Sequence, residues 1–68
     1  MTFHDIISVI RDFDEIKVID TFTRHEYYFG RKSQFPMMLF DKIWKYEVDN
    51  IHPLNNESHK CIVVEVYE

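Results

Sequence analysis

The residues best suited to chemistry lie near the end of the chain, at His52, His59 and Cys61. Imidazole nitrogen and thiolate sulfur are the usual protein ligands of zinc. Their spacing matches no standard zinc pattern, and strand alternation places His59 and Cys61 on one face without supplying a fourth ligand. We therefore predict that these side chains hold no metal, and we keep a small metal-binding protein as an alternative.

Other candidate catalytic groups have simpler structural explanations. Cys61 has no histidine arranged beside it in sequence, and lone cysteines in strands are usually small buried apolar residues. The carboxylate pairs Asp12/Asp14 and Glu47/Asp49 could act as general acid and base only if one pKa were raised inside a cleft. A chain of 68 residues has little capacity for such a pocket, and its only glycine cannot form a phosphate-binding loop. We predict a protein that is not an enzyme and has no cofactor.

Length and composition favour one small domain over residues 1–68. The single cysteine excludes an internal disulfide, so the core must be aliphatic and aromatic or be completed by a partner. The hydrophobic fraction is 46% and the aromatic fraction 16%, which is more than so short a chain easily hides. Some aromatic side chains are therefore expected at an interface.

The formal charge of -4 arises from acidic and basic residues that alternate along the whole chain. Binding to nucleic acid needs clustered Lys and Arg, whereas the one local basic pair is Arg31-Lys32, so we expect no direct nucleic-acid binding. No apolar run approaches the length of a membrane span. The start of the chain has a helical pattern in place of a signal peptide, and we expect a cytoplasmic protein with no membrane contact.

Two stretches have the three-and-four spacing of amphipathic helices. The first begins after Thr2, which with Asp5 resembles a capping box, and we predict a helix over residues 3–12. The second follows Gly30 and Pro36, which suit a chain reversal and a first helical turn, and we predict a helix over residues 36–44. The apolar stripes are Phe3, Ile6, Ile7, Ile10 and Phe13 in the first helix and Leu39, Phe40, Ile43 and Trp44 in the second.

Four stretches resemble strands: residues 15–19, 26–29, 46–52 with a bulge, and 61–67. The last has Ile62, Val64 and Val66 on one face and Cys61 and Val63 on the other, so it is expected in the centre of the sheet or against a second molecule. Pro53 is expected to end the third strand before a polar loop over residues 54–60. The predicted fold is α+β, in the order αββαββ, with a four-stranded antiparallel sheet and two short helices packed on one face.

The aromatic residues provide the clearest functional indication. Most of Tyr28, Phe35, Trp44, Tyr46 and Tyr67 are expected in the core, because a small domain needs its large side chains there. The functional hypothesis is that Tyr28, Phe35 and Tyr67, with Arg31 beside them, remain exposed as anchors for a protein partner or a second copy. An edge strand of the sheet, with its unpaired backbone groups, could also support a homo-oligomer.

Acidic mimicry of nucleic acid is another hypothesis for the same charge balance. It requires a surface of one sign, for example with Asp12, Asp14, Glu15, Asp49 and Glu57 on one side. The lysines that lie between these residues in sequence favour a mixed, solvated surface instead.

One further pattern, from Glu15 onward, consists of Ile16, Val18, Tyr28, Gly30, Pro36, Leu39, Val48, Ile51, Ile62, Val64 and Val66. With these residues, the order of elements resembles that of small uncharacterised proteins encoded by bacteriophages and integrated mobile elements of Gram-positive bacteria. This resemblance implies an accessory protein that acts by protein–protein contact on a host factor, and it implies no catalytic residue. Some phage proteins of this size inhibit host defence nucleases, so an inhibitor of a host nucleic-acid enzyme is an alternative to a self-associating interaction module.

Overall fold

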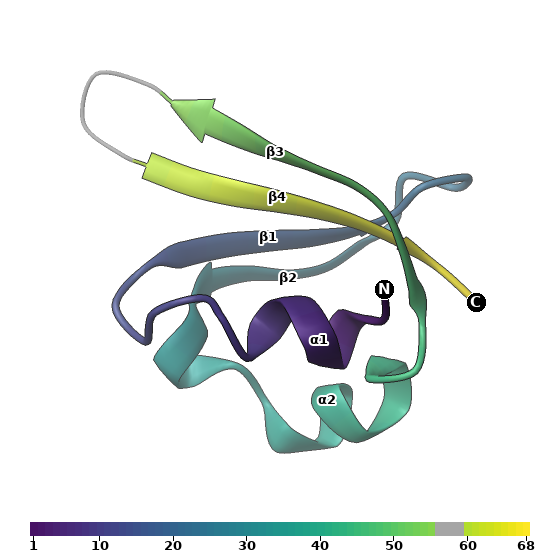
Figure 1. Ribbon diagram of the computed structural model, residues 1–68, viewed down its shortest axis with the longest axis horizontal. Helices are drawn as coiled ribbons and strands as arrows, with labels where there is room; N and C mark the ends of the chain where they lie inside the picture. The colour runs from purple at the N-terminus through teal and green to yellow at the C-terminus, as the bar shows by residue number, and fades with distance from the viewer. Residues whose placement is uncertain (56–59) are drawn as a thin grey trace.

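The computed structural model describes residues 1–55 and 60–68, and within these residues it has helices on one side of a single sheet (Figure 1). The strands lie in the order β2-β1-β4-β3. The α+β class and the order αββαββ are therefore confirmed. The elements are α1 (Phe3–Ile7), β1 (Glu15–Asp20), β2 (Glu26–Arg31), the 3-10 helix η1 (Lys32–Gln34), α2 (Met37–Ile43), β3 (Glu47–Asn55) and β4 (Lys60–Tyr67).

The sheet is mixed, and the prediction of a fully antiparallel sheet is wrong. β1 pairs with β2 and β3 pairs with β4 in antiparallel fashion, but the two central strands β1 and β4 run parallel, in a register that extends from Glu15↔Cys61 to Asp20↔Val66. Two hairpins thus meet side by side. The alternation of apolar and polar residues along a strand shows which face of the sheet each side chain occupies. This pattern is the same whether the neighbouring strand is parallel or antiparallel, so it does not predict strand direction.

The two central strands bury apolar residues on both faces of the sheet. Ile16 and Val18 of β1 are fully buried on the helix side, and Ile19 is only 5% exposed on the other side. In β4 the predicted division of faces is confirmed, since Val64 belongs to the core under the helices while Val63 is buried on the opposite face. Strands buried on both faces are typical of parallel pairing.

Helix α1 begins as predicted and ends early. The Thr2 side chain accepts from the backbone N–H of Asp5, and the Asp5 carboxylate accepts from the Thr2 N–H, which completes the capping box. The helix ends at Ile7, whereas the prediction extended to residue 12. The Ser8 hydroxyl donates to the Asp5 carbonyl. The backbone N–H groups of Val9 and Ile10 then donate to carbonyls only three residues back, so the chain forms a tighter turn after the helix. Ile10 is still buried in this turn.

The third strand carries the predicted bulge, between Val48 and Asn50. Contrary to the prediction, the strand continues through Pro53, which pairs with Ile62, as far as Asn55. β3 is an edge strand, and an edge tolerates proline because one side of its backbone needs no partner in the ladder. Helix α2 lies within one residue of its predicted bounds at each end.

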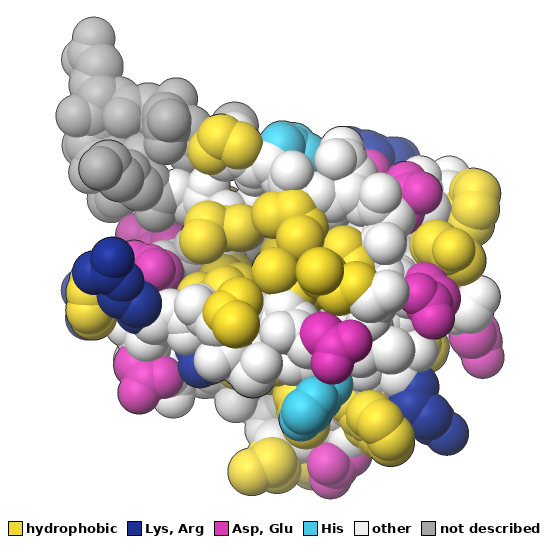
Figure 2. Space-filling view, in the orientation of Figure 1, with side chains coloured by type: hydrophobic (Ala, Val, Ile, Leu, Met, Phe, Trp, Pro, Cys, Tyr) yellow, Lys and Arg dark blue, Asp and Glu magenta, His cyan; other side chains and the backbone are white. Residues whose placement is uncertain are grey.

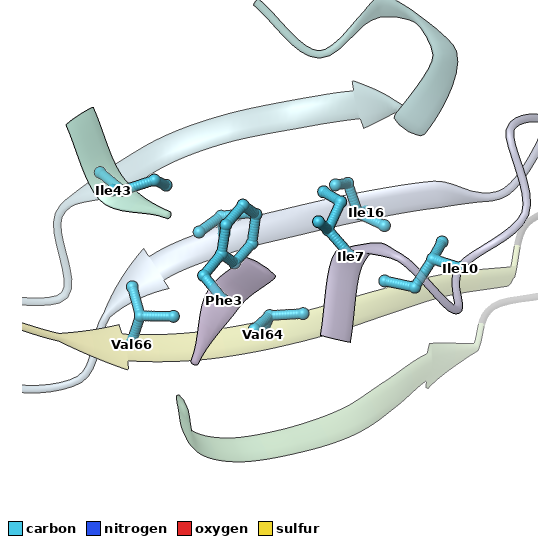
Figure 3. Close-up of a cluster of buried hydrophobic side chains, with 8 residues drawn as sticks. Phe3, Ile7, Ile10, Ile16, Ile43, Val64 and Val66 are labelled. Carbon is cyan, nitrogen blue, oxygen red and sulfur yellow. The ribbon is translucent and has the colours of Figure 1, made fainter. Parts of the chain in front are cut away.

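The core lies between the helices and the central strands (Figure 3). Phe3 and Ile7 of α1, and Ile10 just after it, point at β1 and β4, and Ile43 of α2 reaches the same layer from the side of β2. The largest fully buried side chains are Phe3, Ile16, Ile43, Val18, Val64 and Val66.

Gly30 is the position where the backbone leaves no room for a side chain. Its φ is 158°, and a Cβ placed there would lie 2.7 Å from the Tyr28 hydroxyl oxygen. That hydroxyl donates to the Arg31 carbonyl at 2.7 Å, so the ring cannot move away without losing this hydrogen bond.

We expect the Gly30→Ala variant to lower the free energy of unfolding by about 1–3 kcal/mol, because the new methyl group overpacks the site. In a Tyr28→Phe background, Gly30→Ala should lower the free energy of unfolding by less, because the Tyr28 hydroxyl oxygen nearest to the new methyl group is absent. The backbone strain at residue 30 is the same in both backgrounds. Chemical denaturation of the four proteins of this cycle measures both costs. Equal costs in the two backgrounds would contradict the steric explanation.

Candidate interaction surface

The structure brings three of the four predicted interaction residues together and leaves the fourth apart. The rings of Tyr28 and Phe35 meet edge to face with centroids 4.7 Å apart, and both are half-buried against the core. Arg31, whose carbonyl holds the Tyr28 hydroxyl, is exposed. Tyr67 lies at the end of β4, where its ring packs against Phe22 at 5.7 Å. Tyr28 and Phe35 are therefore supporting residues with one accessible side, rather than free anchors.

A cleft opens beside Phe35, between α1 and the segment that contains η1 and α2. Its volume is about 290 Å³. The residues that line it are mainly apolar, with polar groups from α1 and η1 among them: His4, Ile7, Ser8, Lys32, Phe35, Met37 and Phe40. This size suits one or two apolar side chains of a partner or a small ligand.

Helix α2 leaves large apolar side chains in solvent next to this cleft. Leu39, Phe40 and Ile43 face the core, and the rest of the helix turns outward. We call the exposed residues Met37, Met38 and Trp44 the α2 surface; their exposed fractions are 73%, 86% and 41%. Sequence reasoning assigned no role to the two methionines. The signal was present, because a stripe at residues 39, 40 and 43 leaves residue 38 on the outer side of the helix.

Trp44 is held in place at the end of α2 by neighbours on both sides. The His4 ring meets it edge to face at 6.4 Å, and the Lys45 ammonium lies 5.7 Å from its ring centroid. The fifth ring of the predicted aromatic group, Tyr46, is half-buried and packs against Tyr27 at 6.1 Å.

The segment around the α2 surface differs in charge from the rest of the chain. Residues 31–45 contain four cationic side chains (Arg31, Lys32, Lys42 and Lys45) and one carboxylate (Asp41), a net charge of +3. The whole chain carries -4, so the remaining residues carry -7. Lys42 and Lys45 are the exposed cations of α2 and its C-terminal end, while Lys32 pairs with Asp12 from outside the segment at 3.5 Å.

A second apolar surface lies on the other flank of α1, beside β3. Ile51 and Pro53 pair with Val64 and Ile62 of β4, and opposite residues in a ladder share a face, so they lie on the helix side of the sheet. Ile6 and Ile62 are half-buried against the core. We call Ile6, Ile51, Pro53 and Ile62 the β3 patch. Figure 2 shows hydrophobic side chains gathered in the region between α1 and β3, with acidic groups along two of its sides.

The opposite face of the sheet contains a buried carboxylate, Glu65 of β4, which is 8% exposed. Arg24 Nη1 donates to its Oε1 at 2.7 Å, His52 Nε2 lies 3.0 Å from its Oε2, and the Thr21 hydroxyl donates at 3.3 Å. Burial raises the pKa of this carboxyl, but the hydrogen bonds from Arg24, His52 and Thr21 lower the pKa by more than burial raises it. The pKa of Glu65 therefore lies below its ordinary value.

The turn between β1 and β2 positions the arginine of this cluster. The Asp20 carboxylate accepts from the backbone N–H groups of Phe22 and Thr23, both at 2.8 Å, and these bonds lower the pKa of Asp20. Arg24 then adopts a left-handed φ of 64°, which is uncommon for a residue other than glycine. The turn thus directs the guanidinium onto Glu65.

Of the residues considered for metal binding, His52 and Cys61 have other structural roles. His52 faces Glu65, Cys61 is buried, and His59 lies outside the described residues. Burial and the nearby Glu15 carboxylate raise the pKa of the Cys61 thiol, with Lys17 partly offsetting them, so the thiolate is disfavoured. In residues 1–55 and 60–68, no cluster of three or more His, Cys, Asp or Glu side chains is arranged to hold a metal ion.

The acidic residues considered for mimicry are partly engaged with neighbouring groups. Asp12 Oδ1 lies 3.5 Å from the Lys32 ammonium, and the Asp49 carboxylate accepts from the Thr21 hydroxyl at 2.8 Å. Glu57 lies outside the described residues. Where the structure describes the chain, none of its helices is both long and apolar enough to span a bilayer.

Comparison with known proteins adds no assignment, since no protein-family model, curated protein or solved structure matches the chain.

Glu65 should make the protein sensitive to acid. Its carboxylate stabilises the folded state fully above its ordinary pKa of 4.5, and this stabilisation is lost as the pH falls below 4.5 through the lower pKa of the folded state. We expect the free energy of unfolding to fall less steeply below pH 4.5 in the Glu65→Gln variant than in the original chain. Denaturant unfolding at several pH values measures this, with Glu26→Gln on β2 as a matched control. Identical slopes for Glu65→Gln and the original chain would contradict the role of the cluster.

Cys61 should be protected from thiol reagents in the folded protein. Its side chain is 4% exposed on a central strand, and burial disfavours the reactive thiolate. We expect labelling by a chromogenic disulfide to be more than about 100-fold slower under native conditions than in denaturant, because reaction requires opening of the sheet. Rapid labelling of the native protein would show an accessible thiol and reopen a nucleophilic role.

Proposed function

We propose that this protein is a non-enzymatic protein-interaction module, and that it contacts its partner through the α2 surface and the adjoining cleft. The observation that carries the proposal is the exposure of Met37, which lines the apolar cleft, together with that of Met38 and Trp44 from the same part of the chain. Contiguous apolar surface rimmed by polar residues marks interaction sites on small proteins.

The cleft supplies what an interaction surface needs at its centre. Ile7, Phe35 and Phe40 provide apolar walls that can receive an aliphatic or aromatic side chain, and Tyr28 supports Phe35 from behind. Buried anchors of this kind contribute most of the affinity of a typical interface. Met37, at the edge of the cleft, is unbranched and can adjust its rotamer to the shape of the partner.

The polar groups at the cleft favour a partner with acidic character. Lys32, which also pairs with Asp12 at 3.5 Å, and His4 line it, and residues 31–45 around it carry a net charge of +3. Charges at the rim of an interface mainly raise the association rate and select against wrong partners, whereas the apolar centre determines how long a complex lasts. Arg31, one of the residues predicted from sequence, belongs to this cationic rim, whereas Tyr67 lies outside the proposed surface.

A single charge introduced on the α2 surface should remove binding without unfolding the protein. We expect Met38→Asp to reduce capture of partner proteins from a Gram-positive bacterial lysate by about tenfold or more, because it places a carboxylate in the apolar contact. Quantitative mass spectrometry of proteins retained by the immobilised chain gives the readout.

The matched control is Phe13→Asp, which changes a side chain that is 66% exposed in the segment between α1 and β1 and outside the proposed surface. It should retain the same proteins as the original chain. If every protein retained by the original chain is retained equally by Met38→Asp, the α2 surface is not the binding site and the proposal fails.

A further inference from the structure

We propose that the α2 surface of one copy binds the β3 patch of a second copy of this chain, which gives a head-to-tail assembly. The inference rests on the proposed function, because it names a partner for the same surface. Its basis is that one chain carries two exposed apolar surfaces, Met37, Met38 and Trp44 on one and Ile6, Ile51, Pro53 and Ile62 on the other.

The two surfaces are complementary in charge. The α2 surface lies in the segment of net charge +3, with Lys42 and Lys45 exposed beside it. Beside the β3 patch, α1 and β3 carry the exposed carboxylates Asp5 and Glu47, of which Glu47 lies 3.4 Å from the N-terminal ammonium, and acidic groups border the patch in Figure 2. Opposite potentials favour the approach of these surfaces and disfavour pairing of either surface with itself.

The two surfaces are also complementary in the kind of side chains they offer. The β3 patch consists of branched aliphatic side chains and a proline on a sheet and a helix, so its shape is fixed by the backbone. The α2 surface offers two methionines, which adapt to such a shape, and Trp44, which is the residue type most enriched in interface hot spots.

The geometry separates the two surfaces so that each copy can bind two neighbours. His4 and Ser8 on one flank of α1 line the cleft beside α2, while Ile6 lies on the other flank, toward β3. A contact between different patches of identical chains is heterologous, so it closes into a ring or continues as an open chain. Assembly should therefore grow with protein concentration and weaken as salt screens the charges.

Light scattering after size-exclusion chromatography tests the assembly at several concentrations and at low and high salt. The original chain and the Phe13→Asp control should form species larger than a dimer. Met38→Asp damages the α2 surface and Ile51→Lys gives the β3 patch a repelling charge, so each variant alone should be monomeric. Circular dichroism verifies that both variants are folded, which is expected because the two side chains are 86% and 38% exposed.

A mixture of the two variants gives the decisive readout. The Met38→Asp chain keeps an intact β3 patch and the Ile51→Lys chain keeps an intact α2 surface, so one productive contact remains. The mixture should form a heterodimer of one copy of each and nothing larger. The proposal is overturned if the original chain is monomeric under all conditions, or if it assembles while the mixture forms no heterodimer.

These outcomes are distinguishable from failure of the proposed function. A chain that stays monomeric and still captures other proteins in a manner that depends on Met38 would refute the second copy as partner and leave the interaction surface intact. A chain that assembles while Met38→Asp has no effect on assembly or capture would refute both.

Discussion

The structure depends on a backbone junction between the first residues of the chain and the segment that follows α2. The N–H groups of Phe3 and His4 donate to the carbonyls of Tyr46 and Trp44, at 2.8 and 3.1 Å, and the Val48 N–H donates to the Met1 carbonyl at 2.8 Å. The first N–H groups of a helix have no partner within it, and carbonyls at the end of a helix lack one as well. Here the free N–H groups at the start of α1 donate to free carbonyls at the end of α2 and just after it. The positive dipole end of α1 thereby meets the negative dipole end of α2.

This junction determines the two surfaces proposed for interaction. It holds α1 beside the end of α2, so the cleft between them has fixed walls, and it packs His4 against Phe40 and Trp44. The same bonds place α1 next to the start of β3, where Thr2 forms a bridge with Glu47. Ile6 thereby comes to lie beside the strand that carries Ile51. A five-residue helix would not be stable by itself, so its position comes from these tertiary bonds and from the burial of Phe3 and Ile7.

Local patterns in the sequence predicted what depends on local chemistry. The capping box at Thr2, the core-facing Leu39, Phe40 and Ile43 of α2, the bulge in β3 and the two-faced apolar character of β4 all follow from residue type and spacing over a few positions. Trp44 and Phe13, which the predicted apolar stripes included, are instead 41% and 66% exposed, because both lie beyond the last residue of their helix. The parallel pairing of β1 with β4 could not be predicted this way, because it joins residues more than forty positions apart and alternation is the same for either direction. The candidate site was only partly predictable for the same reason. Phe35 was identified as an aromatic of interest, but its partners His4 and Ser8 reach the cleft only through the junction.

Polar contacts cover the two faces of the sheet differently. No helix of the described residues covers the other face of the sheet, yet Ile19, Cys61 and Val63 are buried there. Long side chains provide the cover: Lys17 pairs with Glu26 at 3.7 Å and lies 5.9 Å from the Phe29 ring centroid, and Arg24 and His52 close over Glu65. Polar and cationic side chains can cover apolar surface with their aliphatic stems while their charged groups stay hydrated. Around α2 and β3, Met37, Met38 and Ile51 are 73%, 86% and 38% exposed. Burial of this apolar area would be favourable, which is the physical basis of the proposed contact.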